Sequence, residues 1–181
     1  MIYTRQPIST AAPYRLDDVK GRARVDHDDE DAGIAIMAET AAAEIERHCE
    51  LALLAQTITV TFRAWCKRIP LPVGPLYAAG DPLTVELIDD TGTATPHPAG
   101  WWIEGDRYPV LNLTTTTNAT ALRIVYLAGY GLDVDSIPAD LQLAISDHAA
   151  RLYDLRGADD AAQGLSLAAS RIAARHRRVA V

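Results

Sequence analysis

The longest helical pattern in the chain lies between residues 28 and 50. Side chains that belong to one helical face recur there every three or four positions, at Ile34, Met37, Ala41, Ile45 and His48. This spacing is typical of an amphipathic α-helix. The acids of its first turn suit the positive end of the helix dipole, and Asp26 is placed to cap it. The sequence therefore predicts a helix from about Asp28 to Glu50.

A second long helix is predicted after Pro138, because proline is tolerated in a first helical turn. Ser136 is its candidate cap, and Gly157 is the expected end. Its apolar stripe consists of Leu141, Ile145, His148, Leu152 and Leu155. Two shorter helices are predicted at about 16–24 and 165–178. The last of these is rich in alanine, so it is expected to be marginal alone and to wait for a partner to order it.

Between the two long helices the pattern changes to a period of two. Residues 56–62 alternate Ile58, Val60 and Phe62 with threonines, and further short strands are predicted at 83–88, 101–103, 110–113 and 121–127. No helix-length crossover separates these strands, so antiparallel pairing is expected. Residues 69–75 contain three prolines and are predicted to be irregular.

These elements together predict an α+β fold in which a small antiparallel β-domain is inserted into a helical unit. The predicted parts are a flexible N-terminal arm at 1–13, a helical unit from 14–55 and 128–157, a β-domain at 56–127 and a C-terminal tail at 158–181. A chain of 181 residues is long enough to bury a core of its own.

Composition and charge narrow the classes of function. The net charge of −7 argues against non-specific nucleic-acid binding, which needs cations to neutralise phosphates. No apolar run approaches the ~18 residues that span a bilayer. Two cysteines without a secretory signal fit a reducing cytosol. The charge is uneven, since seven acids lie between Asp17 and Asp31 while the last turns are basic. The basic end is either an interaction tail or a solvated helix.

Candidate chemistry is sparse. The run from Asp26 to Asp31 offers metal-ligand types, but helical residues fan out over more than a turn and lack the EF-hand spacing, so a helix start is favoured over a metal site. His148 is expected to be a satisfied core histidine rather than a ligand. His48 and Cys49 are adjacent on a helix and point apart, which argues against a catalytic pair. His97 lies in a presumed loop without an evident partner. No catalytic, metal or cofactor site is therefore predicted.

The three tryptophans are the remaining candidates for a binding function. Trp65, Trp101 and Trp102 are expected to be core or interface anchors of the β-domain rather than a dedicated ligand platform.

Several segments follow one another in a recognisable order. They are Leu16-Asp-Asp-Val-Lys20, Arg24-Val-Asp-His-Asp-Asp-Glu-Asp31, Gln56-Thr, Ile69-Pro-Leu-Pro with Pro75-Leu76, Leu122-Arg-Ile-Val-Tyr-Leu-Ala-Gly-Tyr-Gly131, Ile137-Pro-Ala-Asp-Leu141, Ala144-Ile145 and Leu152-Tyr-Asp-Leu-Arg156. In this order they resemble the head–tail connector (adaptor) family of long-tailed phages, prophages and gene transfer agents. The resemblance covers about residues 14 to 157 and is strongest in a strand, a turn, a proline and a helix in series. It departs from the family pattern at Ala23 and over Tyr108 to Thr120.

The resemblance implies a structural virion protein made in the bacterial cytoplasm and not an enzyme. Family members form a ring, typically twelve-fold, beneath the portal protein, extend the DNA channel and carry the next neck or tail-completion protein. DNA is expected to pass the lumen without specific binding. Their C-terminal segment commonly docks on the portal, and this expectation assigns portal contact to Arg171, Arg175, Arg177, Arg178, Val179 and Val181.

Three alternatives remain open at this point. One is a head-completion or stopper protein at another level of the neck. The second is a small metal-dependent hydrolase that uses the cluster from Asp26 to Asp31. The third is a DNA-binding module that uses the terminal arginines, whose affinity would fall steeply with salt.

Overall fold

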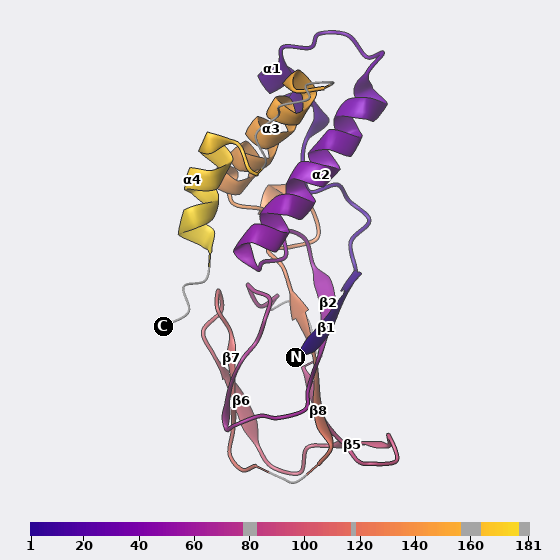
Figure 1. Cartoon of the computed structure of the whole chain (residues 1–181), viewed down its shortest axis with the longest axis vertical. Coiled ribbons are helices and arrows are strands. Elements are labelled where there is room, and N and C mark those ends of the chain that lie inside the picture. Colours follow the sequence, from indigo (N-terminus) through magenta and orange to yellow (C-terminus); the bar gives the residue numbers. More distant parts are fainter. Residues whose placement is uncertain (78–82, 117–118, 157–163, 178–181) are drawn as a thin grey trace. The chain divides into compact units, whose positions relative to one another are not determined.

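The computed structural model describes residues 1–77, 83–116, 119–156 and 164–177. The chain divides into two compact units (Figure 1). The β unit consists of residues 1–9 and 54–130, and the helical unit of residues 10–53 and 131–181. The predicted α+β class, with antiparallel sheets between helices from the two ends of the chain, is confirmed. None of the helices formed by the described residues is long and apolar enough to cross a membrane.

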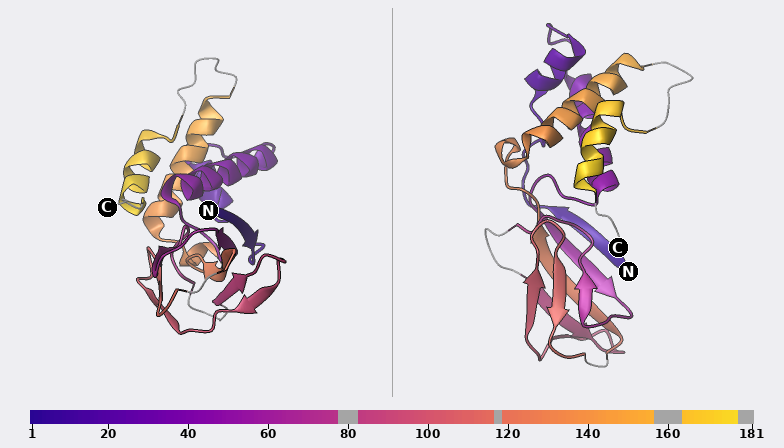
Figure 2. Two further views of the ribbon diagram at one scale, coloured as in Figure 1. Left: turned by 60° about the horizontal axis from the view of Figure 1, so that its bottom comes forward. Right: turned by 90° about the vertical axis from the view of Figure 1, so that its left-hand side faces the viewer.

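Four α-helices build the helical unit. Helix α3 packs against each of the other three, and α2 also packs against α1 and α4 (Figure 2). Small side chains allow this close approach, because the buried face of α2 contains Ala38, Ala41 and Ala42 beside Ile34 and Ile45. The helices are α1 (Leu16–Ala23), α2 (Asp31–Cys49), α3 (Ala139–Asp154) and α4 (Leu167–His176), with a 3-10 turn η1 (Val134–Ser136) before α3.

Eight strands build two antiparallel sheets in the β unit. The five-stranded sheet has the order β1-β2-β8-β4-β5, and the three-stranded sheet has the order β3-β7-β6. The strands are β1 (Ile2–Pro7), β2 (Gln56–Phe62), β3 (Arg68–Pro70), β4 (Thr84–Ile88), β5 (Ala94–Pro96), β6 (Trp101–Glu104), β7 (Val110–Leu113) and β8 (Ala121–Ala128).

The register of the sheets decides which side chains are buried. Ile58 lies opposite Tyr126 and Val60 opposite Ile124, and all four are at most 1% exposed. The alternate positions of β2, three threonines, are half-buried on the other face. Tyr126 is held by two hydrogen bonds, one donated by Val73 N at 3.0 Å and one donated by its hydroxyl to Val73 O at 2.9 Å. The alternation in residues 56–62 therefore predicted both the strand and its buried face.

Two glycines explain the turn that follows β8. Gly129 has a φ of +138°, and a Cβ there would lie 2.5 Å from the carbonyl oxygen of Leu54. At Gly131 a Cβ would lie 2.3 Å from the hydroxyl oxygen of Ser136. Any larger residue would clash at both places, so the Ala-Gly-Tyr-Gly motif is a packing requirement of this turn.

The structure corrects several sequence predictions about strands. Residues 2–7 of the expected flexible arm form β1, which pairs with β2 along its whole length. Residues 68–70 form the short strand β3, although 69–75 was predicted to be irregular. Pro70 is tolerated because it ends a strand at the edge of its sheet. Strand β5 was missed because all three of its residues are exposed and show no apolar alternation.

The predicted helix ends also need correction. Helix α2 begins at Asp31 rather than Asp28, and Asp26 does not cap it, because the side chain of Lys20 draws Asp28 into the loop before the helix. The residue before α3 is Pro138, while Ser136 belongs to η1. The expected end at Gly157 lies outside the described residues. That the chain comprises separate domains with the predicted boundaries stays a prediction.

Candidate assembly surfaces

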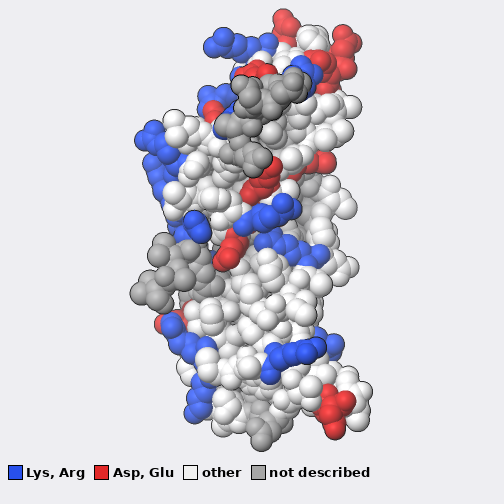
Figure 3. Space-filling view, viewed as in Figure 1, with Lys and Arg blue, Asp and Glu red and all other residues white. Residues whose placement is uncertain are grey.

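The basic face of α4 is defined by Arg171, Arg175 and Arg177, which are all exposed. Arg171 and Arg175 are four residues apart, so they lie on the same side of the helix. Figure 3 shows blue side chains along the left margin, where α4 lies, and red ones at the upper end, over the connection from α1 to α2. The face contains no acid, because residues 167–177 include none.

Helix α4 is fixed within its own unit rather than waiting for a partner. Ser166 caps it, since its hydroxyl accepts a hydrogen bond from Ala169 N at 3.1 Å and donates one to Asp147 Oδ2 at 2.7 Å. The Ser166 N–H in turn lies 3.2 Å from His148 Nδ1. Ala169 and Ala173 are fully buried toward the other helices. The alanines that made this helix look marginal are thus its packing surface, which corrects the expectation that a partner orders it.

His176 anchors the far end of α4. Its Nε2 lies 2.7 Å from Asp140 Oδ2 at the start of α3. Burial raises the pKa of Asp140, but the hydrogen bonds from His176 and from the N–H of Leu141 outweigh it, so the pKa ends below its ordinary value. With both ends of α4 fixed in this way, its arginines are held on one rigid surface.

The remaining residues of the predicted portal-binding set, Arg178, Val179 and Val181, lie outside the described residues. The structure places Arg171, Arg175 and Arg177 together, and their contact with a portal stays a prediction.

The acidic cluster before α2 is neutralised within the chain. Lys20 Nζ lies 2.5 Å from Asp28 Oδ1 and 2.7 Å from Asp31 Oδ1. The hydrogen bond from Lys20 holds the pKa of Asp28 below its ordinary value, and the two carboxylates raise the pKa of Lys20. Within residues 1–77, 83–116, 119–156 and 164–177, no three histidine, cysteine or acidic side chains converge as metal ligands. The geometry therefore favours a structural role for this cluster.

A second charged contact ties the start of α2 to the end of α3. Arg156 Nη1 lies 2.9 Å from Glu30 Oε1, and the Tyr153 hydroxyl donates a short hydrogen bond to the other oxygen of Glu30. The Arg156 guanidinium also stacks over the Tyr153 ring at 3.7 Å. The hydrogen bonds from Tyr153 and then Arg156 lower the pKa of Glu30.

The histidines behave as structural groups. His148 is 1% exposed, and its Nε2 lies 2.6 Å from Glu44 Oε2, which confirms it as a satisfied core histidine. His48 is exposed while Cys49 is buried, so they form no catalytic pair. His97 lies in a loop, as expected, but it is buried, and it has a partner because its Nδ1 lies 3.1 Å from the carbonyl oxygen of Ala99.

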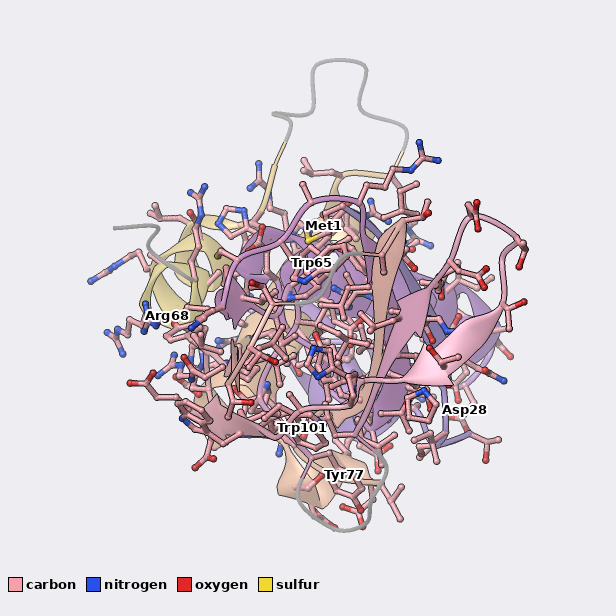
Figure 4. All side chains as sticks on the ribbon, turned by 90° about the horizontal axis from the view of Figure 1, so that it is seen from below. Met1, Asp28, Trp65, Arg68, Tyr77 and Trp101 are labelled. Carbon is pink, nitrogen blue, oxygen red and sulfur yellow. The ribbon has the colours of Figure 1, made fainter. Side chains whose placement is uncertain are left out.

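The tryptophans mark the edge of the three-stranded sheet. Trp101 and Trp102 begin β6 and are 37% and 54% exposed, and Figure 4 shows Trp101 at the rim of the β unit. Trp102 lies in register with Asn112, which lies in register with Arg68, so these three share one outward face. Of the two expected roles, core or interface anchor, the exposure of Trp102 leaves the interface role, which stays a prediction.

An open groove of about 480 Å³ lies between α1 and α3. It is lined by polar and apolar groups in similar proportion, among them Asp17, Asp18, Gln142 and Leu143. Arg22, at its wall, lies 3.3 Å from Asp147 Oδ1. The described residues that line the groove include no histidine or cysteine.

Solved structures provide the comparisons. No family model matches the chain, and no curated protein matches its sequence significantly. Three structures match all of this chain and 97% of their own chains. They are the neck of an empty gene transfer agent particle computed with C6 symmetry (24% identity, TM-score 0.81), the virion of a native gene transfer agent particle (24%, 0.80) and the neck of a native particle computed with C12 symmetry (25%, 0.73). The chain therefore has the fold of neck and virion chains of gene transfer agent particles, in agreement with its sequence resemblance to head–tail connectors.

Proposed function

We propose that this chain is a structural neck protein of a phage-like particle, and specifically a head–tail adaptor that forms a ring beneath the portal. One observation carries the proposal: the likeness to chains of gene transfer agent necks extends over all of this chain and 97% of the matched chains.

The ring is supported by the symmetry of the matched necks, which were computed with C6 and C12 symmetry. Closed rings use heterologous contacts, in which two different surfaces of one subunit meet those of its neighbours. In this proposal the basic face of α4 contacts the portal, and the next neck or tail-completion protein binds the opposite side of the ring. DNA passes through the lumen without specific binding, since the net charge of −7 opposes adhesion of phosphates.

The neck role is tested by deleting the gene in its producing strain and counting joined and unjoined particles by electron microscopy. Separate heads and free tails, restored to joined particles by complementation, are the expected result. Normally joined particles in the deletion strain would reject the neck role.

The portal contact is tested by reversing charge on the basic face. The variant Arg171→Glu/Arg175→Glu is expected to weaken binding to purified portal at least about tenfold, because close charge pairs in interfaces contribute more than 1.4 kcal/mol. The matched control Arg24→Glu/Arg47→Glu makes the same change in net charge at exposed positions outside α4. Equal binding of the two variants to portal would contradict the proposal that the basic face contacts the portal.

A stopper or head-completion protein is the second candidate, because likeness to chains of a neck fits any level of the neck. The two roles differ in their direct partner. An adaptor binds purified portal alone, whereas a stopper binds only after an adaptor is in place. Pull-down on portal rings with and without the other neck proteins distinguishes them.

A further inference from the structure

The β unit has four sheet edges, and they differ in how well they are guarded against pairing with another strand. Edge strands present unpaired main-chain groups, and natural proteins protect them by shortness, proline and charge. Strand β3 has three residues and contains Arg68 and Pro70. Strand β5 also has three residues and ends in Pro96. Both of these edges are therefore guarded.

The other two edges, β1 and β6, are open. Strand β1 pairs with β2 over six consecutive residues without a bulge, and its only proline is at its last position. Strand β6 contains the run Trp-Trp-Ile-Glu and no proline. They also concentrate exposed apolar surface, since Ile2 is 72%, Trp102 54%, Tyr3 40% and Trp101 37% exposed.

The connections place the two open edges on opposite sides of the β unit. The chain passes from β2 to β3 through residues 63–67, so β3 lies on the side of β1 and β2. It passes from β5 to β6 through residues 97–100, so β6 lies on the side of β5. Figure 4 agrees, because Met1 at the start of β1 and Trp101 at the start of β6 are well separated. One unit thus carries an open edge at each side.

Charge favours pairing between the two different edges. Strand β1 contains Arg5 and no acid, and β6 contains Glu104 and no base. A β1–β1 pair brings two arginines together and a β6–β6 pair brings two glutamates together, whereas β1 with β6 joins opposite charges. The complementary combination is heterologous, and repeated head to tail it generates a ring if the rotation closes.

We propose that β1 of one copy pairs with β6 of a neighbouring copy, so that main-chain hydrogen bonds between subunits continue the sheets around the ring. This inference rests on the proposed function for its setting, a ring of identical subunits. The inference specifies which surfaces of neighbouring subunits meet and how they bind each other. An edge strand of one copy adds to the sheet of the next, and aromatic and aliphatic side chains cover the junction.

Cross-linking tests the pairing. The background variant Cys66→Ser removes the exposed cysteine, and Cys49 is 1% exposed and stays. Thr4→Cys and Glu104→Cys are introduced together, and particles from a complemented deletion strain are treated with a short bis-maleimide that tolerates differences in register. The expected result is a ladder of covalent oligomers up to the full ring. Either cysteine alone is expected to give monomer.

Two outcomes overturn the proposal. One is the absence of a ladder from the double variant in particles that contain the protein. The other is a dimer from either single cysteine, which indicates an isologous contact. If the wild-type chain is absent from particles, the proposed function fails instead. In that case the same cross-linking, carried out on the purified chain at high concentration, tests the pairing of β1 with β6 independently of the neck role.

An edge-guarding variant gives an independent measurement. Ile2→Lys/Thr4→Lys places two lysines on the open edge and is expected to lower incorporation into particles about tenfold, the effect of a modest loss of contact energy. The matched control Ala94→Lys/Thr95→Lys puts the same charges on β5, where wild-type incorporation is expected. Circular dichroism of both purified variants verifies that they fold. Equal incorporation of the two variants contradicts the pairing of β1.

Discussion

The surfaces of the two units differ in net charge and in the number of exposed apolar side chains. The β unit contains six lysines and arginines and six acids, so the net charge of −7 resides entirely in the helical unit. Among the residues that the structure describes, six of the ten exposed large apolar side chains belong to the β unit, and five of these six lie on β1, β6 or the residue before β1. A neutral unit with apolar edges suits close contact between copies, whereas a charged unit suits contacts steered by electrostatics.

The two units also differ in what holds them together. Close main-chain approach and buried hydrogen bonds dominate in the β unit, at Gly129 and Tyr126. Ion pairs and a side-chain cap fix the helices, at Lys20, Glu30 and Ser166. All three tryptophans belong to the β unit, so their fluorescence reports its unfolding, while circular dichroism at 222 nm reports mainly the helices. The two probes therefore separate the units in one experiment.

The largest effect is expected from Gly129→Ala in the β unit. The substitution forces a Cβ against the Leu54 carbonyl in a left-handed conformation, so we expect a loss of about 3 kcal/mol of unfolding free energy. Urea unfolding followed by tryptophan fluorescence measures it. The control Gly33→Ala, on α2 where a Cβ meets nothing within 4 Å, is expected to stabilise by about 0.5–1 kcal/mol. An unchanged fluorescence midpoint for Gly129→Ala would contradict the prediction.

Tyr126→Phe should cost about 1–3 kcal/mol, because it leaves the N–H and carbonyl of Val73 without their buried partner. The measurement is again the fluorescence-detected urea midpoint. A shift of the fluorescence transition without a shift of the circular dichroism transition would establish separate domains. Coincident shifts of both probes would establish that the chain unfolds as a single cooperative fold, which would contradict independent unfolding of the two units.

Ser166→Ala removes the cap of α4 and the hydrogen bond to Asp147, with an expected cost of about 1 kcal/mol. Hydrogen exchange of the α4 amides is expected to accelerate, while the amides of β8 keep their protection. Ser170→Ala, at an exposed position on the same helix, is the control and should leave exchange unchanged. Equal acceleration in both variants would show that the cap does not fix the helix.

The smallest effect is expected from Glu30, and it depends on pH. Its pKa is lowered in the folded chain, so its stabilisation is complete above the ordinary value of 4.5 and is lost as the pH falls through the lower folded value. The thermal midpoint of the wild type should therefore exceed that of Glu30→Gln at pH 6, and the gap should close in more acidic solution. A gap independent of pH between 6 and 3 would exclude this contribution.

The sequence predicted the long helices and the buried strands well, because wide stripes and alternation reflect burial directly. Ile34, Ile45 and Ile58 show this, since each is buried as its pattern predicts. The sequence pattern did not predict strands β1, β3 and β5, because edge strands are short or exposed on both faces. The start of α2 was misplaced because side-chain partners such as Lys20 for Asp28 come from elsewhere in the chain, and the residue before α3 is Pro138 rather than the expected cap Ser136.

The candidate surfaces were predictable to a different degree. The sequence already indicated that the last turns of the chain are basic, and the structure shows Arg171 and Arg175 exposed on α4. The role of Ala169 and Ala173 as a packing surface depends on contacts with helices far away in the sequence, so composition alone suggested a marginal helix. The open edges of β1 and β6 become visible only when the strand order is known, because the residues of a strand do not show whether it lies at the edge of its sheet.

The path of the chain between the units has a consequence for biosynthesis. Residues 1–9 belong to the β unit, 10–53 to the helical unit, 54–130 to the β unit again and the remainder to the helical unit. Because ribosomes add about 5–20 residues per second, β1 waits several seconds before β2 is made. Neither unit can close until most of the chain has left the ribosome, and during that interval Ile2 and Tyr3 are available to other nascent chains. Crowded translation of this message would thus favour early association of copies through the same strand.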